Sequence, residues 1–159
     1  MTLSILVNEL SVILLNRQLK LTTAESCTGG GLSYYLTAQP GSSAWFESGL
    51  VTYSNEAKMA LLGVKESTLQ SFGAVSENTA REMAEGALLS KRADIAISIT
   101  GIAGPDGGTK EKPIGTVWFG IASQNGKTKT FMFHFKGDRE TIRLASIEQA
   151  LKELKKYLH

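Results

Sequence analysis

The chain has 159 residues, 42% hydrophobic and 20% charged, which is typical of one globular domain. Its net charge of +2 is too small to predict a nucleic-acid partner. There is no apolar run of about 18 residues and no signal-peptide pattern, so we expect one domain over residues 1–159 that is cytoplasmic and makes no membrane contact. A single cysteine and two histidines disfavour a zinc site, so we expect no metal.

The first third of the chain predicts two helices and a strand around one serine. Leucine and isoleucine recur every three or four positions over residues 2–17, which predicts an amphipathic helix. A strand over residues 21–24 then leads through Ser26 into a helix over residues 27–37. Pro40, followed by glycine, ends that helix.

The rest of the chain predicts three helices and four strands. In the strand over residues 94–100, isoleucines alternate with small residues, which predicts a central strand covered on both faces. Asn125-Gly126 is a strong hairpin signal. The elements are a strand over 45–53, a short helix over 55–63, a helix over 76–88, a strand over 94–100, a strand over 114–123, a strand carrying Phe131, Phe133 and Phe135, and a helix opened by Asp138 with Leu144, Ile147, Leu151, Leu154 and Leu158 on one face.

These elements predict the fold class. Five helices and five strands follow one another in a mixed order that contains one hairpin. Such an order favours an α/β protein with a three-layer α/β/α sandwich and a mixed sheet.

Ser26 is the first candidate for chemistry. It sits where the predicted strand meets the predicted helix, and the free amides of a first helical turn suit an anion. Three glycines, residues 29–31, follow and would be costly inside a helix, which suggests close approach to bare backbone. The alternative is an ordinary serine N-cap.

A nucleophilic serine needs a base. Histidine is the usual one, but His134 lies between phenylalanines and His159 is the last residue. A lysine that loses its proton is the remaining option, and Lys58 follows a strand end early in a helix, where burial and the helix dipole lower the pKa of an amine. Tyr53 could hydrogen-bond either group. Cys27 is a rival nucleophile, with a small buried hydrophobe as its alternative role.

A long glycine-rich loop over residues 101–110 could close over a substrate, although it matches no phosphate-binding fingerprint. Arg139 begins the last helix, where an anion would also find free amides. The alternative for Arg139 is a surface arginine paired with a neighbouring carboxylate.

Seven motifs, in order and over nearly the whole chain, resemble the CinA C-terminal domain family. They are Thr23-Ala24-Glu25-Ser26-Cys27-Thr28-Gly29-Gly30, Gly41-Ser42-Ser43, Val51-Thr52-Tyr53-Ser54-Asn55-Glu56-Ala57-Lys58, Gly73-Ala74-Val75-Ser76, Gly101-Ile102-Ala103-Gly104-Pro105-Asp106-Gly107-Gly108, Lys112-Pro113-Ile114-Gly115-Thr116-Val117 and Gly137-Asp138-Arg139.

The stand-alone members of that family are nicotinamide-nucleotide amidases, which hydrolyse nicotinamide mononucleotide to nicotinate mononucleotide and ammonia. The resemblance implies the same activity without a cofactor, with Ser26 as nucleophile, Lys58 as base and Tyr53 beside them. We expect Arg139, ahead of Arg143, to hold the substrate phosphate. Pocket or oxyanion contacts are expected from Cys27, Thr28, Gly29, Gly30, Ser43, Thr100, Gly101 and Gly104.

Two other functions remain open from the sequence. The domain could bind a pyridine nucleotide without turnover, as a silent module of the competence- or damage-inducible type. The enzyme could instead use Cys27 as its nucleophile. The family also tends to oligomerise, so we expect a homodimer, with the first and last helices as candidate interfaces.

Overall fold

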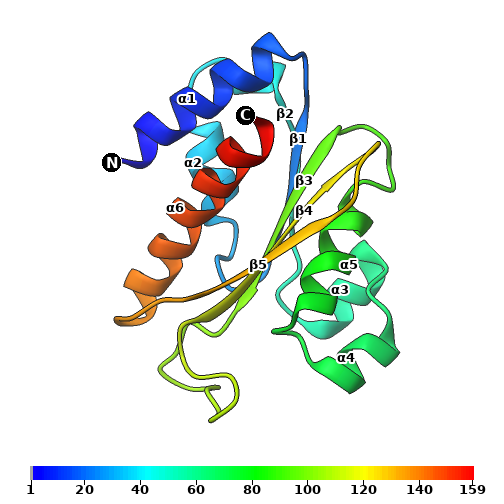
Figure 1. The fold of residues 1–159 in the computed structure, drawn as a ribbon, viewed down its shortest axis with the longest axis vertical. Coiled ribbons are helices and arrows are strands. Elements are labelled where there is room, and N and C mark those ends of the chain that lie inside the picture. Colours follow the sequence, from blue (N-terminus) through cyan, green and yellow to red (C-terminus); the bar gives the residue numbers. More distant parts are fainter. Residues whose placement is uncertain (1) are drawn as a thin grey trace.

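The computed structural model describes residues 2–159. Its strands form one five-stranded sheet with helices on both faces (Figure 1). The predicted three-layer α/β/α sandwich is therefore confirmed. The elements are α1 (Leu3–Asn16), β1 (Leu21–Glu25), α2 (Gly31–Thr37), the 3₁₀ turn η1 (Ser42–Ala44), β2 (Phe46–Val51), α3 (Asn55–Leu62), α4 (Glu66–Phe72), α5 (Glu77–Ala87), β3 (Ile95–Gly101), β4 (Thr116–Ser123), β5 (Lys129–His134) and α6 (Arg139–Leu158).

The sheet is mixed, as predicted. Its order is β2-β1-β3-β4-β5. β1 runs parallel to both β2 and β3, whereas β4 is antiparallel to β3 and β5 to β4. The carboxyl ends of β1, β2 and β3 therefore meet at one edge of the sheet, which is where ligands bind in open α/β folds.

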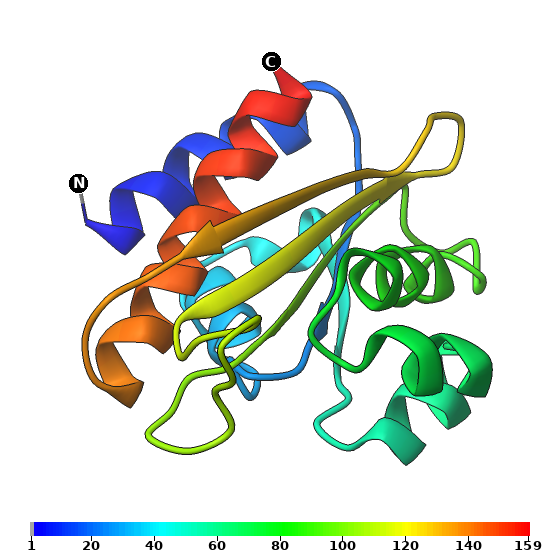
Figure 2. The same ribbon diagram turned by 60° about the horizontal axis from the view of Figure 1, so that its bottom comes forward.

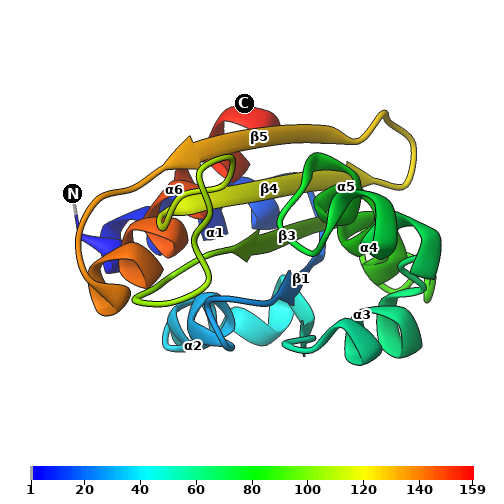
Figure 3. The same cartoon turned by 90° about the horizontal axis from the view of Figure 1, so that it is seen from below.

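The two faces of the sheet carry separate apolar clusters. α1, α2 and α6 cover one face, and α3, α4 and α5 lie on the other side (Figure 3). Ile95, Ile97 and Ile99 of β3 join the first cluster, while Ala96 joins the second. The prediction that β3 is covered on both faces is thus confirmed, and its small residues let α5 approach closely.

The hydrophobic pattern missed one helix, α4. It is seven residues long, and Thr68 is its only buried residue, so it shows no apolar period. The expected apolar face of the last helix is also corrected at one position, because Leu144 is 38% exposed. Three residues that were predicted to lie in strands, Tyr53, Ile114 and Phe135, lie just outside β2, β4 and β5.

The segment between β3 and β4 is the longest connection at the carboxyl edge. In Figure 2 it lies at the same end of the sheet as the amino end of α6. No helix within residues 2–159 is long and apolar enough to cross a membrane.

Candidate active site

A pocket of about 260 Å³ opens at the carboxyl edge of β1, β2 and β3. Segments far apart in the sequence meet there, because the three parallel strands all end at this edge. Its walls are Ser26, Cys27, Tyr53, Lys58, Ala74, Val75, Thr100, Gly101, Ile102, Ala103, Gly104, Asp106, Gly107 and Arg139.

Ser26 and Lys58 meet on one wall of this pocket. Ser26 follows the last residue of β1, and Ser54 caps α3 so that Lys58 lies in its first turns. Lys58 Nζ lies 2.9 Å from Ser26 Oγ. The two side chains are only 1% and 8% exposed, so the contact is shielded from bulk water.

Two carbonyl groups hold the Lys58 amine in place. Nζ donates to the carbonyl oxygens of Thr52, at 2.9 Å, and Tyr53, at 3.1 Å. Burial lowers the pKa of Lys58 below its ordinary value of 10.5. A neutral amine has two N–H groups, which satisfy the two carbonyls, and one lone pair, which can face the Ser26 hydroxyl. The geometry therefore suits an amine that accepts the serine proton.

The turn after Ser26 corrects the predicted helix start. α2 begins at Gly31, not at Cys27. Gly29 and Gly30 lie in the turn with φ of 58° and 95°, so they are needed for left-handed backbone rather than for a helix interior. Among residues 2–159, no other residue accepts a hydrogen bond from the amide of Cys27 or Thr28. Of the two residues, Cys27 lines the pocket, so its N–H group is the candidate donor to an oxyanion.

Glu25 is a site residue that the sequence analysis did not single out. Its fully buried carboxylate accepts hydrogen bonds from the amides of Leu32 and Ser33. These first-turn amides of α2 are therefore occupied and do not face a ligand beside Ser26, contrary to expectation. An acidic residue at the end of an otherwise uncharged strand was the available signal, since buried carboxylates need several donors.

Cys27 lines the pocket but is a poor nucleophile. Burial raises the pKa of its thiol from an ordinary value of 9.0 to about 12. The reactive species of a cysteine is the thiolate. At neutral pH the thiol therefore stays protonated, which disfavours the Cys27 alternative.

Tyr53 and Arg139 meet at the rim of the pocket rather than at the serine. The Arg139 guanidinium donates to the Tyr53 hydroxyl at 3.0 Å and to the Gly104 carbonyl at 2.7 Å. Both side chains are exposed, Tyr53 by 60%. Only the backbone oxygen of Tyr53 contacts Lys58, so the phenol touches neither reacting group. Arg143 lies behind the turn, where it donates to the Thr28 carbonyl.

The other predicted residues divide into two groups. Gly101 and Gly104 line the pocket, as does Thr100, whose hydroxyl donates to the Ala74 carbonyl. Thr28, Gly29 and Gly30 shape the turn and lie outside the pocket wall. Ser43 lies in η1, before the amino end of β2, and is therefore at the opposite edge of the sheet from Ser26.

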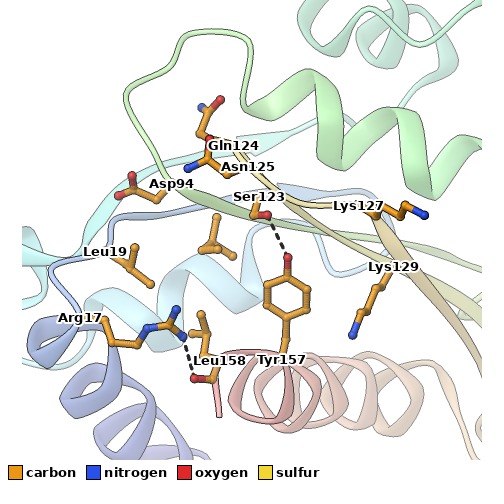
Figure 4. Close-up of a pocket in the computed structure, with 11 residues that line it drawn as sticks. Arg17, Leu19, Asp94, Ser123, Gln124, Asn125, Lys127, Lys129, Tyr157 and Leu158 are labelled. Carbon is orange, nitrogen blue, oxygen red and sulfur yellow. Dashed lines mark hydrogen bonds between the residues drawn. The ribbon is translucent and has the colours of Figure 1, made fainter.

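A larger cavity of about 470 Å³ lies at that opposite edge, between the ends of α1 and α6 and the β4–β5 hairpin. In Figure 4, Tyr157 points toward Ser123 and the Arg17 guanidinium toward the Leu158 carbonyl. Its polar side chains lie mostly at the surface. It holds no serine in contact with a lysine amine among the residues that line it, so we place the candidate active site in the smaller pocket.

Comparison with known families agrees with this architecture. A model of the CinA C-terminal domain matches residues 4–158, nearly the whole chain. The chain belongs to the CinA C-terminal domain family. Its resemblance to that family, inferred from seven motifs, is thereby confirmed.

Relatives within the CinA C-terminal domain family include proteins named as enzymes. The chain is 56% identical over 136 residues to the nicotinamide-nucleotide amidohydrolase PncC of Enterobacter agglomerans, covering 83% of each protein. It is also 56% identical over 133 residues to the protein of that name from Escherichia coli K12, covering 84% of this chain and 81% of that one. A crystal structure of competence damage-inducible protein A from Klebsiella pneumoniae has a TM-score of 0.95 and 42% identity, over 99% of this chain and 98% of that one.

Proposed function

We propose that this CinA-family domain is an amidohydrolase that converts nicotinamide mononucleotide to nicotinate mononucleotide and ammonia. The observation that carries the proposal is the buried 2.9 Å contact between Ser26 Oγ and Lys58 Nζ on a pocket wall. The named activity of relatives at 56% identity supports the substrate. Because those relatives are named as enzymes, they do not support the alternative function, a binding module without turnover.

In the first half of the proposed reaction, Ser26 Oγ attacks the carboxamide carbon while neutral Lys58 takes the hydroxyl proton. The negative charge on the tetrahedral oxygen is stabilised by the amide N–H group of Cys27, which lines the pocket. The C–N bond then breaks, and Lys58 returns the proton to the nitrogen, which leaves as ammonia. An ester between Ser26 and the nicotinoyl group remains.

In the second half, water attacks the ester carbon and Lys58 again acts as the base. The same Cys27 amide stabilises the oxyanion. The ester C–O bond breaks, the proton passes from Lys58 to Ser26 Oγ, and nicotinate mononucleotide is released. Every proton transfer in this scheme uses Lys58, whose pKa is lowered by burial and therefore lies nearer the working range of a base.

We assign the phosphate of the substrate to Arg139. Its guanidinium lies at the pocket rim and has five N–H donors. Two of these donors form hydrogen bonds, one with the Tyr53 hydroxyl and one with the Gly104 carbonyl. A phosphate there would reach the remaining donors while the nicotinamide ring enters toward Ser26. Tyr53 acts in this scheme through Arg139 and through its backbone oxygen.

The remaining predictions are consistent with this function but are not tested by it. They are that residues 1–159 act as one domain, that the reaction is cytoplasmic, that it needs no cofactor, and that the protein is a homodimer. The domain assignment is supported by the single sheet that joins all the strands.

The test is product analysis with purified protein. We expect ammonia and nicotinate mononucleotide in a one-to-one ratio from nicotinamide mononucleotide. Nicotinamide riboside, which lacks the phosphate, should be hydrolysed with a higher KM, and Arg139→Gln should remove most of that difference. Folded protein that binds the nucleotide in calorimetry but releases no ammonia would contradict the proposal.

A further inference from the structure

The carboxylate of Glu25, the residue before the proposed nucleophile, is completely enclosed. Four donors surround it, two on each oxygen. Oε1 accepts from Thr28 Oγ1 at 2.6 Å and from the Leu32 amide at 2.9 Å. Oε2 accepts from the Ser33 amide at 2.9 Å and from Ser33 Oγ at 2.7 Å. Its burial is thus compensated by a full set of hydrogen bonds.

This arrangement requires a carboxylate rather than an amide. Each oxygen faces one backbone N–H, from Leu32 or Ser33, and a backbone N–H cannot reverse its direction. A glutamine here would direct its NH₂ group at one of those N–H groups in either side-chain orientation. The N-cap of α2 is Gly30, which has no side chain to cap the helix, so the negative charge of Glu25 also takes over that role.

The same hydrogen bonds fold the turn that carries Ser26. The Thr28 bond draws residue 28 back to residue 25, so the four residues form a closed loop in which Ser26 lines the pocket. The turn amides without a backbone acceptor among residues 2–159 are those of Cys27, Thr28 and Gly30, and of these three residues Cys27 lines the pocket.

We propose that Glu25 is the positioning residue of this turn: it fixes the direction of Ser26 Oγ toward Lys58 and holds the Cys27 amide at the pocket wall for the oxyanion. This role rests on the proposed function of Ser26 as nucleophile. Glu25 does not touch the substrate and acts only through the turn.

A second contact network anchors Glu25 from the sheet side. Ser33 Oγ also lies 2.8 Å from Thr23 Oγ1 in β1, so Ser33 links Glu25 to the strand that precedes Ser26. Gly49 of β2 makes room for this contact, because a Cβ at that position would overlap Ser33 Oγ. The network therefore depends on both β1 and β2.

The test is the rate at which a fluorophosphonate labels Ser26. In this step the Ser26 Oγ–P bond forms, the P–F bond breaks, fluoride leaves and Lys58 takes the hydroxyl proton. We expect folded Glu25→Gln to label at least about 100-fold more slowly than wild type, because a displaced nucleophile loses its alignment. With nicotinamide mononucleotide, kcat should fall by a similar factor, while KM changes less than about threefold.

The matched control is Glu153→Gln, which removes another buried carboxylate, far along α6 from the site. We expect it to lower the melting temperature while labelling at the wild-type rate. Labelling at the wild-type rate by folded Glu25→Gln would overturn the proposal. If Glu25→Gln does not fold, Thr28→Val decides: labelling about tenfold slower supports the role, and unchanged labelling overturns it.

The labelling assay tests the positioning role of Glu25 independently of the proposal that nicotinamide mononucleotide is the substrate. Wild type that labels at Ser26 but releases no ammonia from nicotinamide mononucleotide would contradict the proposed activity. The comparison between Glu25→Gln and wild type would still report on the turn.

Discussion

At the residue scale, the site depends on one lysine, Lys58, whose burial makes its charged form unfavourable. Burial opposes the charge on Lys58, and no carboxylate pairs with its amine within residues 2–159. Instead, the ammonium or amine is held by Ser26 and two carbonyl groups. A buried amine without a counter-ion is a common sign of a functional base.

Lys58→Met tests whether the amine is needed for the reaction. Methionine has a similar length but cannot take a proton, so we expect kcat to fall by about 10²- to 10⁴-fold, the usual contribution of a general base. Ammonia release under saturating substrate measures this. Lys65→Met makes the same change at an exposed position and should keep the wild-type rate; equal rates in all three proteins would remove Lys58 from the mechanism.

The lowered pKa of Lys58 also predicts a pH dependence of stability. Between the folded-state pKa and the ordinary value of 10.5, the unfolded chain holds a proton on Lys58 that the folded chain does not. The contribution of Lys58 to the free energy of unfolding should therefore increase as pH rises through this window and decrease as pH falls through it.

Denaturant unfolding of wild type and Lys58→Met at a series of pH values measures this contribution. The free-energy difference between the two proteins should shift in favour of wild type with rising pH. A difference that is constant over the whole range would show that folding does not perturb the amine.

At the element scale, the position of α3 determines where Lys58 lies. α3 packs against α5, and Gly86 of α5 sits so close to the last turn of α3 that a Cβ there would overlap the Leu62 carbonyl. The missing side chain therefore allows the two helices to approach. We therefore expect a change at this α5 residue, which does not line the pocket, to shift Lys58 relative to Ser26.

Gly86→Ala should push α3 away from α5. We expect the free energy of unfolding to fall by about 1–3 kcal/mol, as in other overpacked sites, and kcat to fall further than the unfolded fraction explains. Thermal melting and ammonia release check both effects. Asn78→Ala, at an exposed position of the same helix, should change neither; a Gly86→Ala protein with normal stability and rate would contradict the packing argument.

Most elements could be predicted from the sequence because their apolar periods are regular. The isoleucines of β3 and the buried positions of α6 are examples. α4 could not, since its contacts are polar: Thr68 and the Lys65 amide both donate to Glu82, which is distant in sequence.

The candidate site shows the same division. Ser26 and Lys58 were predicted, and the structure brings them together. The role of Glu25 was missed because its donors come from Thr28, Leu32 and Ser33, and only the folded turn brings them to one carboxylate. The start of α2 was misplaced for a related reason, since the glycines were interpreted as helical.

At the scale of the whole molecule, one sheet joins both helical layers, so residues 2–159 should unfold as one unit. Trp45 and Trp118 report on different strands, since Trp45 lies just before β2 and Trp118 lies within β4. We expect their fluorescence and the far-ultraviolet circular dichroism to give one coincident thermal transition. Two separated transitions would contradict the single-domain assignment.

The proposed reaction requires Ser26 as the nucleophile, and a comparison of three proteins tests this role. Ammonia release from nicotinamide mononucleotide should be measured for wild type, Ser26→Ala and Cys27→Ala under the same conditions. We expect wild type and Cys27→Ala to release ammonia, and folded Ser26→Ala to lose nearly all of this activity. Release that persists in Ser26→Ala and disappears in Cys27→Ala would contradict the assignment and make Cys27 the nucleophile.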